Sequence, residues 1–426
     1  MSLVGFEHAG LTVADLDRTI AFYCGLLGLR RVVRKPQPDG ELAFLDTGSG
    51  MLEIFARPGA QRAVDVPVGT AGVRHLTFAV DDVVATVDRL EAAGVEITER
   101  PRDAHNRELI RRVAFCRDPD GLQVELIERA PRRMRLTREL FAALLRLERP
   151  AVSILASSEE QRDGYVLERL RLRIGSTEVR GLLTRPAAPG PHPAILYGHS
   201  HGGRYDIGAD ELLDGREYLL DPLGPVFARA GYVTLCIDMP VFGERGIETE
   251  GFASKALLWQ GKSLIGQMLE NHRAALDYLV GRPDVDPRRI GAFGISMGCT
   301  LSYWLAALDE RIAAVAHLCC FADLRTMIEL GAHDGHGIYL VVPGLLEYAD
   351  AGDIGALIAP RPQLICIGEA DSLTPPLSVE RAWAATKAGY DATGGRLELI
   401  SEPGVGHQET PRMREGALRF FAEHLG

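Results

Sequence analysis

The sequence lacks both an apolar run long enough to span a bilayer and a concentration of basic residues. A transmembrane helix needs about 20 consecutive apolar residues, so we expect no membrane partner. Asp and Glu number 58 against 47 Lys and Arg, which gives a formal net charge of -11. A nucleic-acid partner requires clustered positive charge, so we expect no such partner either.

Cysteines and targeting signals are also scarce. The seven cysteines are scattered and include no C-x-x-C pair, which favours reduced thiols over a disulfide framework. The first residues, MSLVGFEHAG, have neither a basic start nor a long apolar stretch. Because a secretory signal needs both, we expect a cytoplasmic protein.

The chain is long enough for two domains. Its 426 residues, 46% apolar and 25% charged, exceed what one hydrophobic core usually serves. The segment PRRMRLTRELFAALLRLERP spaces its leucines as an amphipathic helix does, and SSEEQRDG after it indicates an exposed loop. We therefore predict domains over residues 1–130 and 165–426, joined by a helical linker over 131–164.

The first domain contains an internal repeat. HAGLTVAD precedes a helical pattern over residues 15–29, and HLTFAVDD precedes another over residues 82–95. Short alternating strands follow each helix and place Glu53 and Glu125 at corresponding points. Both halves are predicted to be βαβββ modules, which makes an α+β domain.

Four repeated residues are candidate metal ligands, namely His8, Glu53, His75 and Glu125. Two histidines and two carboxylates suit a divalent cation such as zinc, nickel or manganese. An unpaired carboxylate facing the core would be costly, and a cation would remove that cost. The alternative is that both glutamates face solvent from the outer side of their strands and that the histidines only open each module.

These positions, with AFYCGLLGL and Asp118-Pro-Asp-Gly, resemble the vicinal oxygen chelate superfamily and within it glyoxalase I. The resemblance implies a bound zinc, nickel, manganese or iron that polarises vicinal oxygens of a substrate, while Glu125 or Glu53 moves a proton. It also implies a homodimer, because many members assemble the cleft across a two-fold axis. Isomerisation, epimerisation and ring cleavage all stay open as reactions.

The second domain alternates strands with helices, as a mostly parallel, doubly wound sheet requires. We predict strands at AILYG, YVTLCID, RIGAFGIS, AAVAHLC, QLICIG and LELIS. Helical patterns fall between most of them, notably SLIGQMLENHRAALDYLVG and GCTLSYWLAALD.

A nucleophile motif stands between one such strand and helix. Gly294-Ile295-Ser296-Met297-Gly298 matches G-x-S-x-G in its strand–turn–helix context. A serine hydroxyl needs a base and an orienting carboxylate, in the chain order Ser, acid, His. Asp371 and His407 each follow a later strand and satisfy that order, with Glu369 as the alternative acid.

An oxyanion hole would complete the site. The loop HSHGG follows an early strand, and we predict that the amides of Met297 and His201 form the hole. The hydrolase site itself needs no cofactor. His199 and His201 are expected to shape the loop rather than to titrate.

Several motifs in order, including DMPVFGER, GISMG, IAPRP and GEAD, resemble the dienelactone hydrolase and acetyl-xylan-esterase-like branch of the α/β hydrolases. The chain departs from this branch at His199-Ser200, where many members have His-Gly, and at Ser296, where dienelactone hydrolases have cysteine. The resemblance implies hydrolysis of an ester, lactone or thioester.

Together the domains predict a bifunctional enzyme whose metal domain prepares a small molecule that the hydrolase then cleaves. Two other interpretations stay open. The first domain could be a ligand-binding or dimerisation module, or the hydrolase fold could be an idle scaffold. The substrate does not follow from the sequence.

Overall fold

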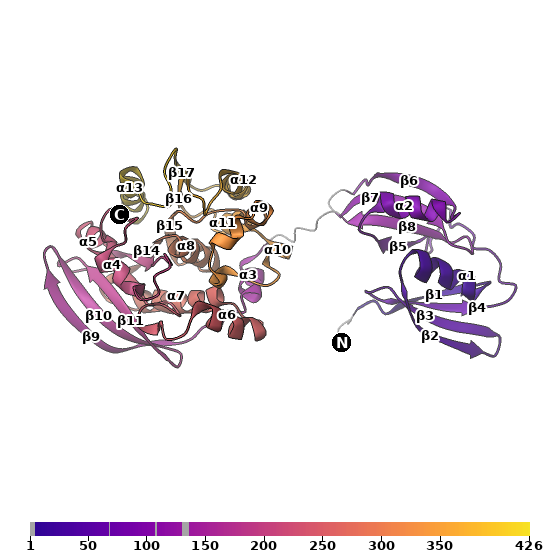
Figure 1. The fold of residues 1–426 in the computed structure, drawn as a ribbon, viewed down its shortest axis with the longest axis horizontal. Coiled ribbons are helices and arrows are strands. Elements are labelled where there is room, and N and C mark those ends of the chain that lie inside the picture. The colour runs from indigo at the N-terminus through magenta and orange to yellow at the C-terminus, as the bar shows by residue number, and fades with distance from the viewer. Residues whose placement is uncertain (1–4, 68, 107–108, 130–135) are drawn as a thin grey trace. The chain divides into compact units, whose positions relative to one another are not determined.

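The computed structural model describes residues 5–67, 69–106, 109–129 and 136–426. The chain divides into two compact units, Met1–Arg132 and Arg133–Gly426 (Figure 1). Each unit is described by itself below. Of the helices in the described ranges, none is both long enough and apolar enough to cross a membrane.

The first unit consists of two βαβββ modules, as the repeat predicts. The first module contains β1 (His8–Val13), α1 (Leu16–Ile20) continuing into the π-helical η1 (Ala21–Leu26), β2 (Arg30–Gln37), β3 (Gly40–Asp46) and β4 (Met51–Ala56). The second contains β5 (Leu76–Ala79), α2 (Val83–Ala92), β6 (Ile97–Asp103), β7 (Ile110–Arg117) and β8 (Gln123–Arg129). Their sheets have the equivalent orders β1-β4-β3-β2 and β5-β8-β7-β6.

The repeat extends to the helix starts and the shared core. Asp15 and Asp82 cap α1 and α2 in the same way, because each carboxylate accepts a hydrogen bond from the amide three residues later. The modules share one apolar cluster. Within it, the buried Tyr23 hydroxyl of the first module donates to Asp118 of the second at 3.0 Å.

The second unit is built on a nine-stranded sheet of order β17-β16-β15-β14-β12-β13-β11-β10-β9. Its strands are β9 (Val152–Arg162), β10 (Tyr165–Ile174), β11 (Thr177–Arg185), β12 (His192–Gly198), β13 (Val233–Ile237), β14 (Val285–Ile295), β15 (Ile312–Leu318), β16 (Gln363–Gly368) and β17 (Leu397–Glu402). The strands from β12 to β17 are mutually parallel, whereas β9, β10 and β11 pair antiparallel with one another and β11 pairs antiparallel with β13. All six predicted strands are confirmed.

Helices lie on both faces of this sheet (Figure 1). The longer ones are α3 (Arg138–Leu144), α5 (Leu223–Arg229), α6 (Glu250–Trp259), α7 (Leu264–Val280), α8 (Met297–Leu308), α12 (Pro376–Thr393) and α13 (Pro411–Leu425). Shorter turns are η2 (Gly208–Asp210), α4 (Glu211–Asp214), η3 (Gly243–Arg245), α9 (Leu324–Glu329), η4 (Ala332–Gly335), η5 (Ile338–Leu340), α10 (Leu345–Tyr348) and α11 (Ala351–Ala356).

Coverage on both faces explains why the central strands are continuously apolar. Along β12, Leu196 packs into the cluster on one face, while Ile195 and Tyr197 pack into the cluster on the other. The predicted doubly wound α/β-hydrolase architecture is confirmed. It brings the carboxyl ends of β12, β14, β15, β16 and β17 to one edge of the sheet.

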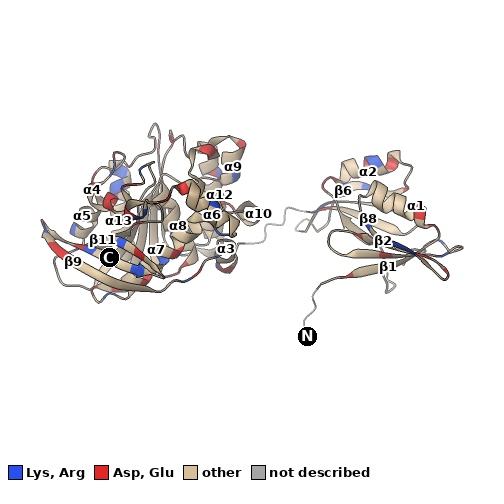
Figure 2. Ribbon diagram, turned by 60° about the horizontal axis from the view of Figure 1, so that its bottom comes forward, with Lys and Arg blue, Asp and Glu red and all other residues tan. Residues whose placement is uncertain are grey.

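The predicted linker differs from the structure. The loop expected over residues 157–164 is wrong, because β9 runs to Arg162 and pairs with β10. Nearly every β9 side chain is exposed, so no apolar alternation marks the strand. Its charged residues, Glu159, Glu160 and Arg162, lie near its carboxyl end, and Figure 2 shows charged residues on this edge of the sheet. Backbone pairing with β10 holds most of it in the sheet, with Val152 packed against the core and Glu159 paired with Arg185 at 3.1 Å.

The helix expected before that strand is present as α3 and belongs to the second unit. Its Phe141 is fully buried against Trp304, and Arg138 Nε donates to the Ala307 carbonyl at 3.0 Å. Residues 131–135 of the predicted linker lie outside the described residues. The second unit thus begins well before residue 165.

Candidate hydrolase and metal-binding sites

Ser296 occupies a sharp turn between β14 and α8. Its backbone has φ 59° and ψ -123°, a conformation that non-glycine residues rarely adopt. A Cβ atom on Gly294 would lie 2.3 Å from the Gly298 carbonyl oxygen, and one on Gly298 would lie 1.9 Å from the Gly198 oxygen. Both flanking positions therefore require glycine, and the turn lifts the partly exposed serine to the edge of the sheet.

The predicted acid and histidine meet in the structure. His407 Nδ1 lies 2.7 Å from Asp371 Oδ2, and the Asp371 side chain is only 1% exposed. Its other oxygen accepts the Leu373 amide at 2.9 Å. Glu369, the alternative acid, instead accepts the Ser401 hydroxyl at 2.8 Å. The geometry thus pairs His407 with Asp371.

Ser296 and His407 converge on the same sheet edge without a hydrogen bond between them in the described residues. Ser296 donates its amide to the Leu318 carbonyl at 2.9 Å, and the adjacent Cys319 thiol reaches the Gln408 carbonyl at 3.6 Å. With Nδ1 committed to Asp371, His407 keeps Nε2 for a substrate-bound state. Such contacts are often long in an empty site and tighten on binding.

The two amides predicted for the oxyanion hole are available. Among the described residues, neither the Met297 nor the His201 amide donates a hydrogen bond. The Ser200 amide, by contrast, donates to both oxygens of the buried Glu211 at 3.0 and 3.1 Å. Because a Cβ on Gly298 would collide with Gly198, the loop lies directly against the elbow.

His199 links this loop to the segment that contains Met239 through two hydrogen bonds of its ring. Its Nε2 accepts the Met239 amide at 3.2 Å and its Nδ1 donates to the Ser200 carbonyl at 3.0 Å. Complete burial lowers the pKa of His199. A neutral imidazole with one donor and one acceptor satisfies both bonds.

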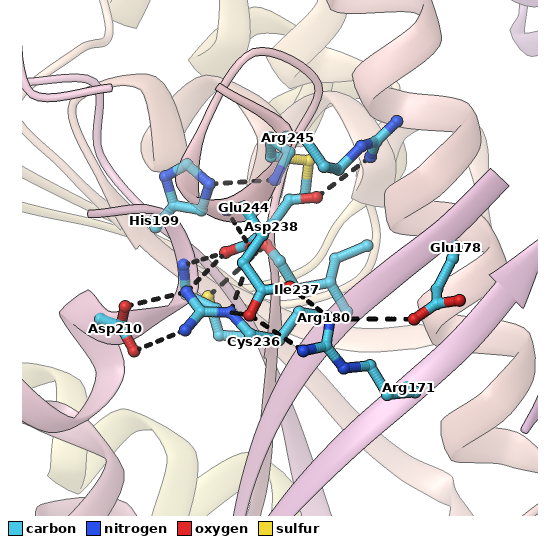
Figure 3. A network of polar contacts seen from close by, with 12 residues as sticks. Arg171, Glu178, Arg180, His199, Asp210, Cys236, Ile237, Asp238, Glu244 and Arg245 are labelled. Carbon is cyan, nitrogen blue, oxygen red and sulfur yellow. Dashed lines mark hydrogen bonds and ion pairs between the residues drawn. The ribbon is translucent and has the colours of Figure 1, made fainter. Parts of the chain in front are cut away.

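The Met239 segment is fixed in turn by a buried ion-pair network (Figure 3). Asp238 is fully buried and accepts Arg180 Nε at 3.0 Å, the Ala209 amide at 2.8 Å and the Glu244 amide at 3.0 Å. Arg180 also pairs with Asp210 at 2.9 Å. Asp238 lies within the DMPVFGER motif, whereas its partner Arg180 lies 58 residues away and no local motif marks it.

Glu211, Tyr218 and Glu250 were also missed. Tyr218 contacts the Ser200 hydroxyl, and its ring lies edge-on to His407 with centroids 6.0 Å apart. Glu250 accepts a hydrogen bond from His201. No local motif marks these residues, because each reaches the loop only through the tertiary fold.

The four candidate metal ligands form two pairs, one in each module. His8 Nε2 lies 3.4 Å from Glu53 Oε2, and His75 Nε2 lies 3.2 Å from Glu125 Oε2. Glu125 also accepts the Thr77 hydroxyl at 2.6 Å. Gly10, the counterpart of Thr77, faces Glu53 across the equivalent parallel strand pair.

The surroundings of the pairs repeat as well. His8 packs edge-on against Phe44, and His75 packs edge-on against Phe115. Leu52 and Ile54 beside Glu53 are buried, as are Val124 and Leu126 beside Glu125. Because side chains alternate along a strand, both glutamates point away from the core.

The structure does not bring the four ligands together. Among the described residues, the one group of three potential ligand atoms within 4.8 Å of one another is Glu398, Glu423 and His424. The contact with Glu7 is the main factor that raises the pKa of His8 above its ordinary value. A pocket of about 650 Å³ beside His75 is lined by residues of both modules, including Arg30, Asp46 and Arg129.

Fold and residues together define an α/β hydrolase preceded by a glyoxalase-like domain. Residues 5–126 match the Glyoxalase/Bleomycin resistance protein/Dioxygenase superfamily, and residues 225–426 match the Prolyl oligopeptidase family. The chain belongs to both families, the first through its N-terminal unit and the second through its C-terminal unit.

Individual relatives cover the two parts separately. "Putative hydrolase YtaP" of Bacillus subtilis is 37% identical over 293 residues, which cover 68% of this chain and 98% of that protein. "Probable lactoylglutathione lyase" of Synechocystis is 30% identical over 127 residues, 28% of this chain and 92% of that protein. The fusion therefore joins two parts that each match nearly the full length of a separate relative.

Solved structures support the fold of the hydrolase. Acetyl xylan esterase 1 from Thermoanaerobacterium has a TM-score of 0.52 at 17% identity, covering 68% of this chain and 92% of that one. An acetyl xylan esterase from Paenibacillus has a TM-score of 0.50 at 20% identity, covering 68% and 93%. At these identities the likeness concerns the fold alone.

Proposed function

We propose that the second unit is a serine hydrolase that cleaves a carboxylic ester, thioester or lactone, with Ser296 as nucleophile. The observation that carries this proposal is the 2.7 Å bond between His407 and Asp371, beside a serine on a strained elbow. The two unpaired amides of Met297 and His201 support it, because they can donate hydrogen bonds to the carbonyl oxygen as negative charge develops on it.

In the proposed reaction, Ser296 Oγ attacks the carbonyl carbon while His407 Nε2 takes the hydroxyl proton. Asp371 orients the ring through Nδ1 and stabilises the imidazolium that forms. Collapse of the tetrahedral intermediate expels the alcohol or thiol, which takes the proton from His407. Water then attacks the acyl-enzyme, with the same histidine as base, and releases the acid.

A fluorophosphonate probe and a panel of aryl esters, thioesters and lactones test this proposal. We expect the wild-type chain to be labelled and active, and Ser296→Ala to lose both labelling and turnover. Ser401→Ala, whose hydroxyl bonds Glu369, should retain both. Equal activity in Ser296→Ala would favour an idle scaffold. Turnover of proline-containing peptides alone would contradict ester cleavage.

For the first unit, we infer a divalent-metal site formed by His8, Glu53, His75 and Glu125. Imidazole and carboxylate ligands suit zinc, nickel, manganese or iron, and each module already places one of each within 3.4 Å. Such a cation, when bound, polarises neighbouring oxygens of a substrate. Glu53 and Glu125 are the groups placed to accept and return a proton beside it.

Because the two pairs lie apart within one chain, we propose that a homodimer joins a pair from one copy to the complementary pair of another. Metal analysis and light scattering on the full chain test this. We expect a dimer with about one metal per chain, and loss of the metal in either His8→Ala or His75→Ala. A monomer that binds the metal at full stoichiometry would contradict assembly across copies.

The separation of the pairs also favours a second candidate, in which the first unit is a non-catalytic ligand-binding or dimerisation module. Stoichiometric metal without turnover of any vicinally oxygenated substrate would support that candidate. The bifunctional proposal instead expects His75→Ala and Ser296→Ala to block successive steps on one compound. The His75→Ala chain should accumulate the first substrate, and the Ser296→Ala chain the hydrolysable product.

A further inference from the structure

Glu250, the first residue of α6, is a buried carboxylate with a complete set of donors. Its Oε2 accepts His201 Nε2 at 2.9 Å and the Tyr205 hydroxyl at 2.7 Å, and its Oε1 accepts the Tyr339 amide at 2.7 Å. The residue is 6% exposed. Burial raises the pKa of Glu250, but these hydrogen bonds outweigh it and leave the pKa below its usual value.

The hydrogen bonds around His201 determine which ring nitrogen carries the proton. The Gly203 amide donates to Nδ1 at 3.1 Å, so Nδ1 must present a lone pair. Nε2 then carries the proton and donates it to Glu250. The ring also stacks on Tyr339 with centroids 5.6 Å apart.

This ring belongs to the residue whose backbone amide is the second proposed oxyanion donor. The preceding amide, from Ser200, is already bound by Glu211 at 3.0 Å, so the loop is fixed on one side at residue 200. On the other side, the restraint on residue 201 runs through its side chain to Glu250. Gly337 leaves room for this carboxylate, because a Cβ there would lie 2.6 Å from Oε1.

We propose that Glu250 is a positioning residue of the hydrolase, which holds the His201 amide toward the oxyanion through the His201 ring. The inference rests on the proposed serine hydrolase function. Loss of this contact should affect kcat more than KM. A loosened loop weakens the bond to an oxygen that carries charge only in the transition state, so turnover suffers more than substrate binding.

Glu250→Gln tests this inference with little change of shape. The glutamine NH₂ group would face either His201 Nε2–H or the Tyr339 amide, and both of these are donors. The other His201 tautomer does not relieve this conflict, because its Nδ1–H would then face the Gly203 amide, which is also a donor. We expect kcat for an aryl ester to fall about 10- to 100-fold with KM within about threefold, below the 10²- to 10³-fold loss of a whole oxyanion donor. Glu248→Gln, an exposed change two residues away, should match wild type.

Two further measurements separate positioning from a general structural role. In protein labelled with ¹⁵N-histidine, we expect the Nε2-protonated tautomer of His201 in wild type and its loss in Glu250→Gln. In a His201→Ala background, Glu250→Gln should change kcat less than twofold, because the link is already broken. A full independent loss in that background would overturn the inference.

The outcomes distinguish this inference from the proposed function. If wild type shows neither fluorophosphonate labelling nor hydrolysis, the proposed function fails. If wild type is active and Glu250→Gln retains wild-type kcat, only the role of Glu250 is wrong. Should Glu250→Gln fail to fold, the tautomer of His201 in wild type still decides, since an Nδ1-protonated ring would contradict the contact geometry.

Discussion

His407 Nδ1 lies 2.7 Å from Asp371 Oδ2 across 36 residues of sequence, and the Asp371 carboxylate is almost fully withdrawn from solvent. The nearby Glu369 is directed to Ser401 instead. Two acids separated by one residue thus have different partners, because the loop after β16 turns only Asp371 inward.

This difference predicts unequal effects of two matched substitutions. Asp371→Asn should lower kcat by about 10⁴-fold, because an amide favours the wrong histidine tautomer. Glu369→Gln should stay within about twofold of wild type in the same ester assay. Similar losses in the two variants would contradict Asp371 as the sole acid.

The contact between Gly298 and Gly198 predicts the cost of enlarging the elbow. Gly298→Ala would place Cβ 1.9 Å from a backbone oxygen, so the oxyanion loop must shift and both activity and thermal stability should fall. Gly251→Ala meets no atom within 4 Å and should stabilise the protein by about 0.5–1 kcal/mol, as expected for alanine in a helix. Ester hydrolysis and the midpoint of thermal unfolding measure both effects.

Two buried histidines predict that the second unit loses stability in acid. Burial lowers the pKa of His272 and of His317 to about 3, with the neighbouring His199 adding to the effect on His272. The unfolded chain, with an ordinary histidine pKa of about 6.5, takes up protons that the folded state does not. The free energy of unfolding is therefore highest above pH 6.5 and falls toward pH 3, by about 2 kcal/mol per histidine at pH 5.

Replacement of His272 tests whether this histidine causes the fall in the free energy of unfolding at low pH. Neither ring nitrogen of His272 has a hydrogen-bond partner in the described residues, so His272→Leu sacrifices no such bond. Urea unfolding at pH 7 and pH 5 should show a smaller difference in this variant than in wild type, by about 2 kcal/mol. An unchanged difference would show that His272 is not the group responsible.

The network of Figure 3 predicts a large stability effect at Asp238, which takes no part in the proposed reaction. Asp238→Asn should lower the free energy of unfolding by about 3 kcal/mol, because it removes one of the carboxylates that pair with Arg180 and leaves an uncharged amide among the donors of a buried site. Glu178→Gln removes a 3.8 Å contact with Arg171 at the surface and should change it by less than about 1 kcal/mol. Urea unfolding distinguishes the two.

The paired ligands of the first unit predict a specific loss of metal. Glu125→Gln should lower the affinity for the metal about 10- to 100-fold, since the amide cannot supply a charged oxygen. Glu128→Gln changes the same strand, but its carboxylate pairs with Arg111 at 2.7 Å. That variant should retain the metal in elemental analysis, and equal losses would contradict the assignment of Glu125.

The sequence by itself predicted the architecture of both units, the six central strands of the second unit and the motif residues. Alternation in LEI around Glu53 and in VEL around Glu125, together with the continuously apolar central strands, follows from local periodicity. Ser296, Asp371 and His407 are predicted from the G-x-S-x-G motif and the chain order Ser, acid, His, and parallel topology brings the strand ends that carry them to one edge of the sheet. Local patterns also placed α3, although not its membership of the second unit.

Only the tertiary structure decided which of these residues meet. The exposed strand β9 left no periodic signal, because backbone hydrogen bonds to β10 depend little on side-chain identity. The four candidate metal ligands are equivalent by repeat, yet they lie in two separate pairs, because repetition specifies each module and not the distance between modules. Likewise Glu250 reaches His201 from 49 residues away, a contact that arises only when the fold brings α6 to the oxyanion loop.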